Sequence, residues 1–177
     1  VVTFYSQGAL KCELEKHGVR VVSLDKNNRW DIFRFAYRFV LFLISFRPHV
    51  IYSFLTGPNL CAIFGKLICP KLQVIWGLRA STPDSNLRSN DYLVSLAFRF
   101  SRRICSIPDK IIVNSERSLE YYKNNGFDKG DLVAIPNGID LQKYRHCPEA
   151  GSQVRKSLGI EDNVYLIGMV ARIHPIK

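Results

Sequence analysis

The sequence lacks the short motifs that mark many nucleotide-binding domains. It contains neither G-x-G-x-x-G nor G-x-x-x-x-G-K-[ST], so the usual dinucleotide site and the P-loop are excluded. Its five cysteines form no C-x-x-C pair, which argues against a disulfide framework and against a zinc site. The longest apolar run, Phe39 to Ile44, is far shorter than the ~20 residues that span a bilayer. We therefore do not expect this chain to cross a membrane by itself.

Positive charge is in excess. Lys and Arg number 25 against 15 Asp and Glu, which gives a formal net charge of +10 over 177 residues. Such an excess favours a phosphate-rich partner: a nucleotide, a nucleic acid or an anionic membrane surface. The cations are dispersed and the aromatic residues lie in core-like stripes, so nucleic acid is the least favoured of the three.

Short apolar runs alternate with helical patterns along the whole chain. The runs are near-continuous rather than alternating, as in strands that helices cover on both faces. This order predicts an α/β fold with a Rossmann-like, doubly wound parallel sheet. Ser115 is suited to begin a helix and Gly126 to end it. The predicted strands are 1–5, 19–24, 50–54, 72–76, 111–114, 132–135 and 164–170, and the predicted helices are 8–17, 30–46, 57–68, 88–106, 115–125 and 151–158.

The helix predicted at 30–46 has more apolar surface than packing on one sheet requires. Phe33 and Tyr37 belong to one stripe at helical spacing, and Phe35 and Phe39 belong to a second. One stripe can pack on the sheet. The other, which arginines flank, needs either a neighbouring helix or domain, or a lipid headgroup layer. Internal packing and peripheral membrane contact through the 30–47 helix both remain open.

Two turns follow predicted strands and could bind phosphate. The segment Pro136-Asn137-Gly138-Ile139-Asp140 is explained as a tight turn without any ligand. In the segment 170–177, Arg172 lies just past a strand, and Lys177 lies beyond a proline. A planar guanidinium and an ammonium at the carboxyl edge of a parallel sheet can hold a diphosphate. An ordinary solvated turn explains the same pair.

Several segments occur in an order that is typical of one enzyme family. They are Pro108 to Ser115, Tyr122 to Gly126, Val133 to Asp140 with Tyr144 beyond, Leu158-Gly159-Ile160 with Arg155 before it, and Ile167 to Lys177. This succession resembles glycosyltransferase family 4, whose members are retaining enzymes with the GT-B fold of two Rossmann-like domains.

The resemblance implies a hexosyltransferase-type enzyme that moves a sugar from a nucleotide-sugar donor to a lipid-linked or polysaccharide acceptor, as in polysaccharide or lipopolysaccharide biosynthesis. It implies a cytoplasmic location, peripheral on the inner face of the cell membrane. Arg172 and Lys177 match the Arg and Lys of the family's G-R-x-x-x-x-K-G segment, which hold the donor diphosphate, although Ala171 replaces the usual Gly. We expect no cofactor and no metal, since the sequence has no Asp-x-Asp cluster.

The acceptor side departs from the family pattern. Tyr52 and Phe54 stand where many members have two histidines, and Arg79 stands where many have another. We assign Arg79, Ser81 and Asn137 to the acceptor-side cleft. Arg79 could face an acceptor phosphate or cap backbone carbonyls in a purely structural role.

The resemblance also predicts an incomplete GT-B protein. Residues 1–161 correspond to an N-terminal, acceptor-side domain that lacks its first strand and helix, which leaves an empty strand position beside 1–5. Residues 162–177 correspond to the start of a nucleotide-sugar-binding domain. We expect such a fragment to be inactive alone. The alternative is a non-catalytic module that binds a glycan or a partner on the same fold.

Overall fold

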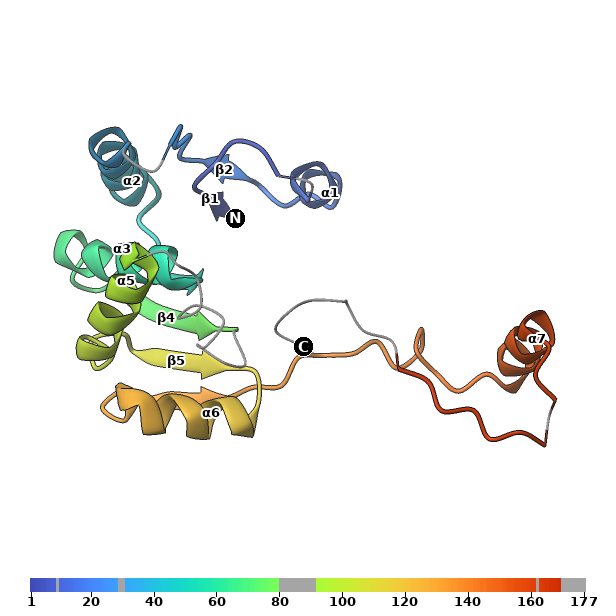
Figure 1. Ribbon diagram of the computed structural model, residues 1–177. Helices are drawn as coiled ribbons and strands as arrows, with labels where there is room; N and C mark the ends of the chain where they lie inside the picture. Colours follow the sequence, from blue (N-terminus) through green and yellow to red (C-terminus); the bar gives the residue numbers. More distant parts are fainter. Residues whose placement is uncertain (9, 29–30, 80–91, 162, 170–177) are drawn as a thin grey trace. The chain divides into compact units, whose positions relative to one another are not determined.

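The computed structural model describes residues 1–169 apart from 9, 29–30, 80–91 and 162. The chain forms two compact units, Val1–Ile135 and Pro136–Lys177, each of which is described by itself (Figure 1). The elements are β1 (Val2–Thr3), α1 (Lys11–Lys16), β2 (Val22–Ser23), α2 (Ile32–Phe46), β3 (Val50–Phe54), α3 (Thr56–Ile68), β4 (Gln73–Leu78), α5 (Tyr92–Arg103), β5 (Lys110–Val113), α6 (Glu116–Tyr122), the wide turn η1 (Lys123–Phe127), β6 (Leu132–Ala134) and α7 (Pro148–Leu158).

All strand pairing in the described part of the chain is parallel. β1 pairs with β2, and a second sheet has the strand order β3-β4-β5-β6. Helices connect successive strands of the second sheet, as long crossovers must between parallel neighbours. The predicted α/β, Rossmann-like fold is confirmed.

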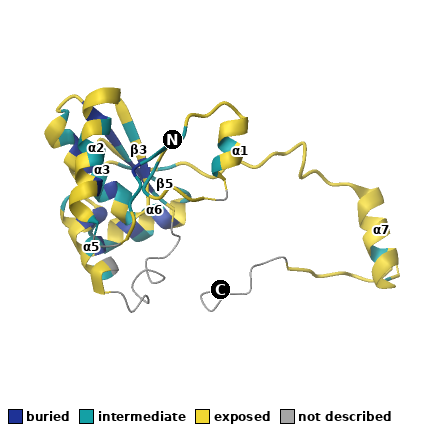
Figure 2. Cartoon of the chain, turned by 90° about the horizontal axis from the view of Figure 1, so that it is seen from above, coloured by how far each residue is buried: buried dark blue, intermediate teal, exposed yellow. Residues whose placement is uncertain are grey.

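The core of the first unit lies between one face of the second sheet and its helices. Each connection from β3 to β6 moves one strand along the sheet, and right-handed crossovers place the connecting helices on one face. Trp76 of β4 and Ile111 of β5 pack there with Ala62 of α3, Phe98 of α5 and Phe127 of η1. Figure 2 shows the buried residues concentrated where this sheet meets α3, α5 and α6.

Helix α2 buries one of its two apolar stripes. The Phe35 ring is buried and lies edge-on to Phe4, with ring centroids 4.6 Å apart. Leu43 is fully buried and lies beside Gly65 of α3. On the opposite stripe, Phe33 is 90% exposed and Tyr37 is exposed as well. Helix α2 therefore has a face of exposed apolar residues that no other described element covers.

Among the described residues of the whole chain, no helix is both long and apolar enough to cross a bilayer.

An apolar groove of about 850 Å³ separates β1 from β3. Residues of both strands line it, together with Phe39 and Phe42 of α2. Cε2 of Phe4, directly after β1, lies 4.0 Å from the position of a Cβ at Gly57, which follows β3, so the carboxyl ends of the two strands lie close together. In the described residues β1 pairs only with β2, and β3 pairs only with β4. The groove thus lies where the expected strand order leaves one position open.

The second unit contains one predicted element and lacks another. Helix α7 begins at Pro148, earlier than predicted, and ends at Leu158, followed by Gly159 as its C-cap with φ of 66°. The strand predicted at 164–170 is wrong for residues 164–169, which form no strand. Tyr165 is almost fully exposed, because no described strand of this unit offers an edge for pairing. The predicted domain boundary after Glu161 is not tested and stays a prediction.

Asp109 joins the start of β5 to β4 and to α3. Its carboxylate accepts a hydrogen bond from the Val74 N–H at 2.6 Å and pairs with Lys66 Nζ at 2.8 Å. Burial raises the pKa of this carboxyl, but the hydrogen bond from Lys66 and that from the Val74 N–H outweigh burial, so the pKa lies below its ordinary value. Asp109, within the Pro108-Asp109-Lys110 segment, therefore has a structural role.

We expect Asp109→Ala to lower the free energy of unfolding by about 1–3 kcal/mol, because it leaves the buried Val74 N–H unsatisfied. Asp109→Asn should cost less, since an amide oxygen can still accept that bond. The carboxylate stabilises the fold above its unfolded pKa of about 3.9 and loses this effect as pH falls through the lower folded value. Urea unfolding between neutral pH and about pH 3 should show a weaker pH dependence for Asp109→Asn. An unchanged dependence would assign the acid sensitivity to other carboxyls.

Candidate active site

The carboxyl edge of β3 and β4 brings aromatic rings and one cation together. Ligands of open parallel sheets bind at this edge. The rings of Tyr52 and Phe54 lie 4.3 Å apart by their centroids. Arg79 follows β4, and its guanidinium carbon lies 5.2 Å from the centroid of the Phe54 ring. Arg79 therefore makes a cation–π contact, which neither of its two predicted roles anticipated.

Gly77 makes this arrangement possible. It pairs with Phe54 across the strands, and a Cβ at Gly77 would lie 2.7 Å from Cδ1 of the Phe54 ring. Because real Cβ contacts are not that short, the Phe54 ring needs a glycine beside it in order to lie across β4. The position of Arg79 depends on that ring and hence on Gly77.

A buried polar pair lies at the same edge, on the helix-covered face of β3. The hydroxyl of Ser53 donates to Oδ1 of Asn59 at 2.7 Å, and Asn59 is only 1% exposed. Nδ2 of Asn59 has no hydrogen-bond partner in the described structure. Leu55, between β3 and α3, has φ of 73°, an unfavourable value for a leucine. The chain thus bends sharply where β3 reaches the edge.

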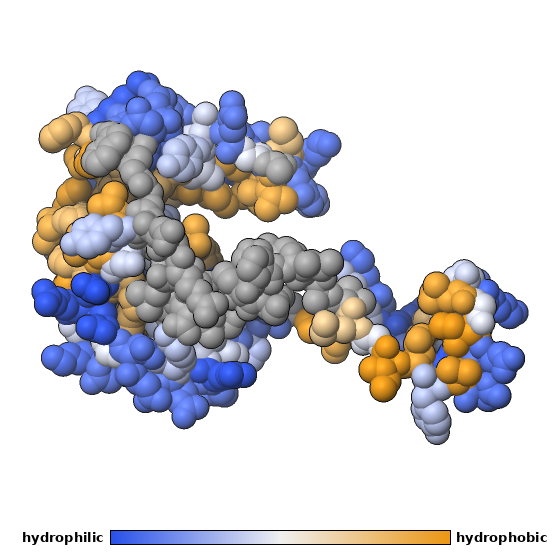
Figure 3. Space-filling model, in the orientation of Figure 1, coloured by the Kyte–Doolittle hydropathy of each residue, from blue (hydrophilic) through white to orange (hydrophobic). Residues whose placement is uncertain are grey.

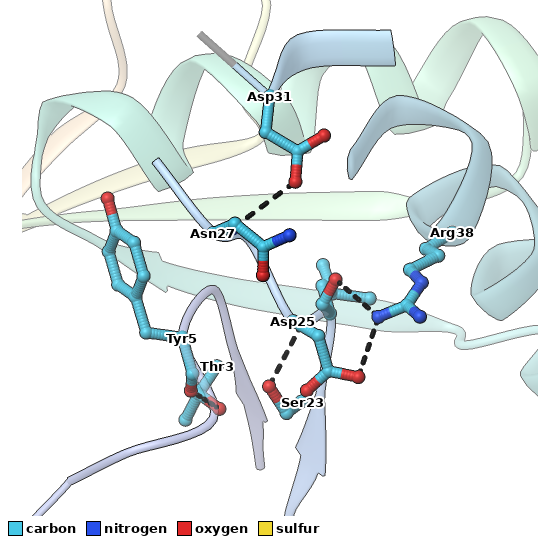
Figure 4. A network of polar contacts seen from close by, with 8 residues as sticks. Thr3, Tyr5, Ser23, Asp25, Asn27, Asp31 and Arg38 are labelled. Atoms are coloured by element: carbon cyan, nitrogen blue, oxygen red, sulfur yellow. Dashed lines mark hydrogen bonds and ion pairs between the residues drawn. The ribbon is translucent and has the colours of Figure 1, made fainter. Parts of the chain in front are cut away.

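A second polar network occupies the carboxyl ends of β1 and β2 (Figure 4). Nη1 of Arg38 donates to Asp25 Oδ2 at 2.6 Å and to the Leu24 carbonyl at 3.3 Å. The hydrogen bond with Ser23 and the Arg38 guanidinium lower the pKa of the Asp25 carboxyl. Arg38 of α2 is therefore engaged by Asp25, whereas the sequence pattern suggested only a cation flanking an apolar stripe.

The predicted site residues fall in different places. Arg79 is exposed at the β3–β4 edge, and Asn137 is exposed in the second unit. Ser81, Arg172 and Lys177 lie outside the described residues. The tight turn predicted for residues 136–140 is not formed there; residues 141–143 turn instead, and the Asp140 carboxylate accepts the backbone N–H groups of residues 142 and 143 at 3.0 and 3.1 Å. The cleft that combines Arg79, Ser81 and Asn137 stays a prediction, as does the Arg172–Lys177 diphosphate site.

Comparison with known proteins decides the family. The profile of Glycosyltransferase Family 4 matches residues 1–143, most of the chain. The chain belongs to glycosyltransferase family 4. Comparison with curated protein sequences gives no significant match. Among solved structures, Anabaena Alr3699/HepE, crystallised with UDP and glucose, is similar with a TM-score of 0.62 and 19% identity.

The likeness to HepE supports the fold of this family 4 chain. It covers 88% of this chain and 41% of HepE, so the chain spans less than half of that protein's length. Sequence reasoning identified the family, but it missed the Phe54–Arg79 contact, the Ser53–Asn59 pair and the Asp25–Arg38 network. Gly77, directly after a buried strand residue, was the one available signal that a ring crosses β4.

Proposed function

We propose that the protein to which this chain belongs transfers a hexose, with retention, from a nucleotide-sugar donor to a lipid-linked or polysaccharide acceptor. The family match over residues 1–143 is the observation on which this proposal rests. Transfer takes place at the cytoplasmic face of the membrane, with α2 as the region of peripheral contact. No metal takes part. The chain alone is inactive, because residues 162–177 supply only the start of the proposed donor domain.

Each proposed site residue has a chemical role. Arg172 and Lys177 hold the donor diphosphate and stabilise the negative charge that develops on the leaving nucleotide. Arg79, Ser81 and Asn137 bind the acceptor. The planar guanidinium of Arg79, whose carbon lies 5.2 Å from the Phe54 ring centroid, is of a kind that binds two phosphate oxygens at once. This geometry suits a phosphate of a lipid-linked acceptor better than an uncharged glycan.

Turnover by the complete protein tests the proposal. Because HepE was solved with UDP and glucose, UDP-glucose is the first donor to try, followed by other nucleotide sugars. We expect release of nucleoside diphosphate that depends on an added lipid-phosphate or glycan acceptor and persists in EDTA. The chain 1–177 alone should release none. Glycan binding without turnover over the donor panel would instead support the non-catalytic binding module.

A further inference from the structure

Three neighbouring helices present apolar residues on one side of the first unit. On α2, Phe33 and Tyr37 are exposed, and on α3, Leu67 is 77% exposed with Phe64 beside it on the same face. Helix α3 contacts both α2 and α5, and the outer face of α5 exposes Leu96. Figure 3 shows hydrophobic residues gathered along the side where Figure 1 places α3 and α5. We name the outer faces of α2, α3 and α5 the outer helical surface.

The charge of this surface is predominantly positive. The sequences of α2, α3 and α5 contain no Asp or Glu. Arg38 and Lys66 on these helices are paired with Asp25 and Asp109. The exposed cations on or next to the three helices are Arg34, Arg47, Lys71, Arg99, Arg102 and Arg103, of which Arg102 lies beside Gly126 of η1. Asp31, directly before α2, is half-buried.

Exposed apolar residues and exposed cations together indicate which partner the outer helical surface binds. A second copy of the chain docked face to face would place these cations against one another, which is unfavourable at close range. A bilayer with anionic lipids satisfies both features, because aromatic and aliphatic side chains enter the headgroup boundary while Arg and Lys remain among the phosphates. We infer that the outer helical surface docks on an anionic lipid bilayer. This inference rests on the membrane contact in the proposed function and extends it from α2 to three helices.

Vesicle co-sedimentation of the complete protein tests the inference. The probes are vesicles of phosphatidylcholine alone and vesicles with about 30 mol % phosphatidylglycerol. We expect binding to the anionic vesicles only, and weaker binding as salt rises from about 0.1 to about 0.5 M. The triple variant Arg34→Gln, Arg99→Gln, Arg103→Gln should bind about 100-fold more weakly.

A matched triple variant on the other helices removes the same charge. Arg117, Lys123 and Lys129 are exposed around α6 and η1, and changing all three to Gln should leave binding within about twofold of the original protein. Equal weakening by both triples would overturn the inference in favour of general attraction by net charge.

The apolar part of the surface needs its own variants. Phe33→Ser with Leu67→Ser should weaken binding at least ~10-fold. Ile139→Ser with Leu141→Ser, which alters two exposed apolar residues of the second unit, should not. All variants should keep the far-ultraviolet circular dichroism of the original protein. A stable dimer that Phe33→Ser disrupts, with no lipid binding, would overturn the inference. Vesicle binding needs no donor, so docking without sugar transfer would disprove the proposed reaction alone.

Discussion

Replacing Trp76 by alanine will lower the free energy of unfolding by about 3–5 kcal/mol, the largest stability effect we expect in this chain. Trp76 has no exposed surface and lies at the centre of β4, packed among Phe98, Ile111 and Phe127. Its loss removes a large apolar surface from the core and leaves a cavity that neighbouring strands cannot fill by moving. Urea denaturation followed by far-ultraviolet circular dichroism will show a lower midpoint at an unchanged slope.

Trp76→Phe is the matched control. Nε1 of Trp76 has no hydrogen-bond partner in the described structure, so the smaller ring loses no hydrogen bond and removes a buried unsatisfied donor. We expect a clearly smaller loss than for Trp76→Ala, because phenylalanine fills most of the volume that alanine leaves empty. A loss as large as that of Trp76→Ala would mean that the indole N–H has a partner, and that this bond rather than apolar packing determines the effect.

The parts of the fold that could be predicted are those with strong local patterns. The run 50–54 became β3 with the predicted bounds, because β-branched and aromatic residues favour extended backbone, although Val50, Tyr52 and Phe54 are exposed. Ser115 begins α6 by accepting the N–H of Ser118 at 3.1 Å, and Gly126 adopts φ of 87°. Side-chain capping and left-handed backbone are properties of a few adjacent residues, so the sequence alone reveals them.

Contacts between distant residues could not be predicted in this way. The run 164–170 has strand character, but residues 164–169 lack a neighbouring edge, and pairing rather than composition makes a strand. Arg38 pairs with Asp25 and Lys66 with Asp109, partners that lie on other elements. Spacing within one helix indicates which face a cation occupies, but not which anion from another element it meets.

In the candidate site, too, the contacts between residues on different strands could not be predicted from the sequence. The motif order identified the family, and Arg79 was selected because it follows a strand end. Its contact with Phe54 depends on strand register, since Gly77 lies opposite Phe54 and leaves room for the ring. Register follows from sheet assembly, which one sequence does not reveal. The hydrogen bonds of the Asp140 carboxylate to its own backbone were predictable because they join residues that are two or three positions apart, although the turn follows Asp140 instead of preceding it.

Arg172→Ala in the complete protein will lower turnover about 10²- to 10³-fold, the largest functional effect we expect. This rests on the proposed function, in which Arg172 and Lys177 hold the donor diphosphate. Removing a preorganised cation from beside the developing negative charge lowers the turnover rate by this factor, because the water that takes its place stabilises that charge only in part. Steady-state release of nucleoside diphosphate should show the loss mainly in kcat, and Lys177→Ala should show a loss of similar kind.

Arg172→Lys separates charge from geometry. Lysine keeps the positive charge but not the planar fork that binds two oxygens at once, so turnover should fall between that of Arg172→Ala and that of the original protein. Arg145→Ala, which removes an exposed arginine of the same unit, is the matched control and should leave turnover unchanged. If Arg172→Ala and Arg145→Ala behave alike, Arg172 belongs to a solvated turn, and other residues of the complete protein bind the donor diphosphate.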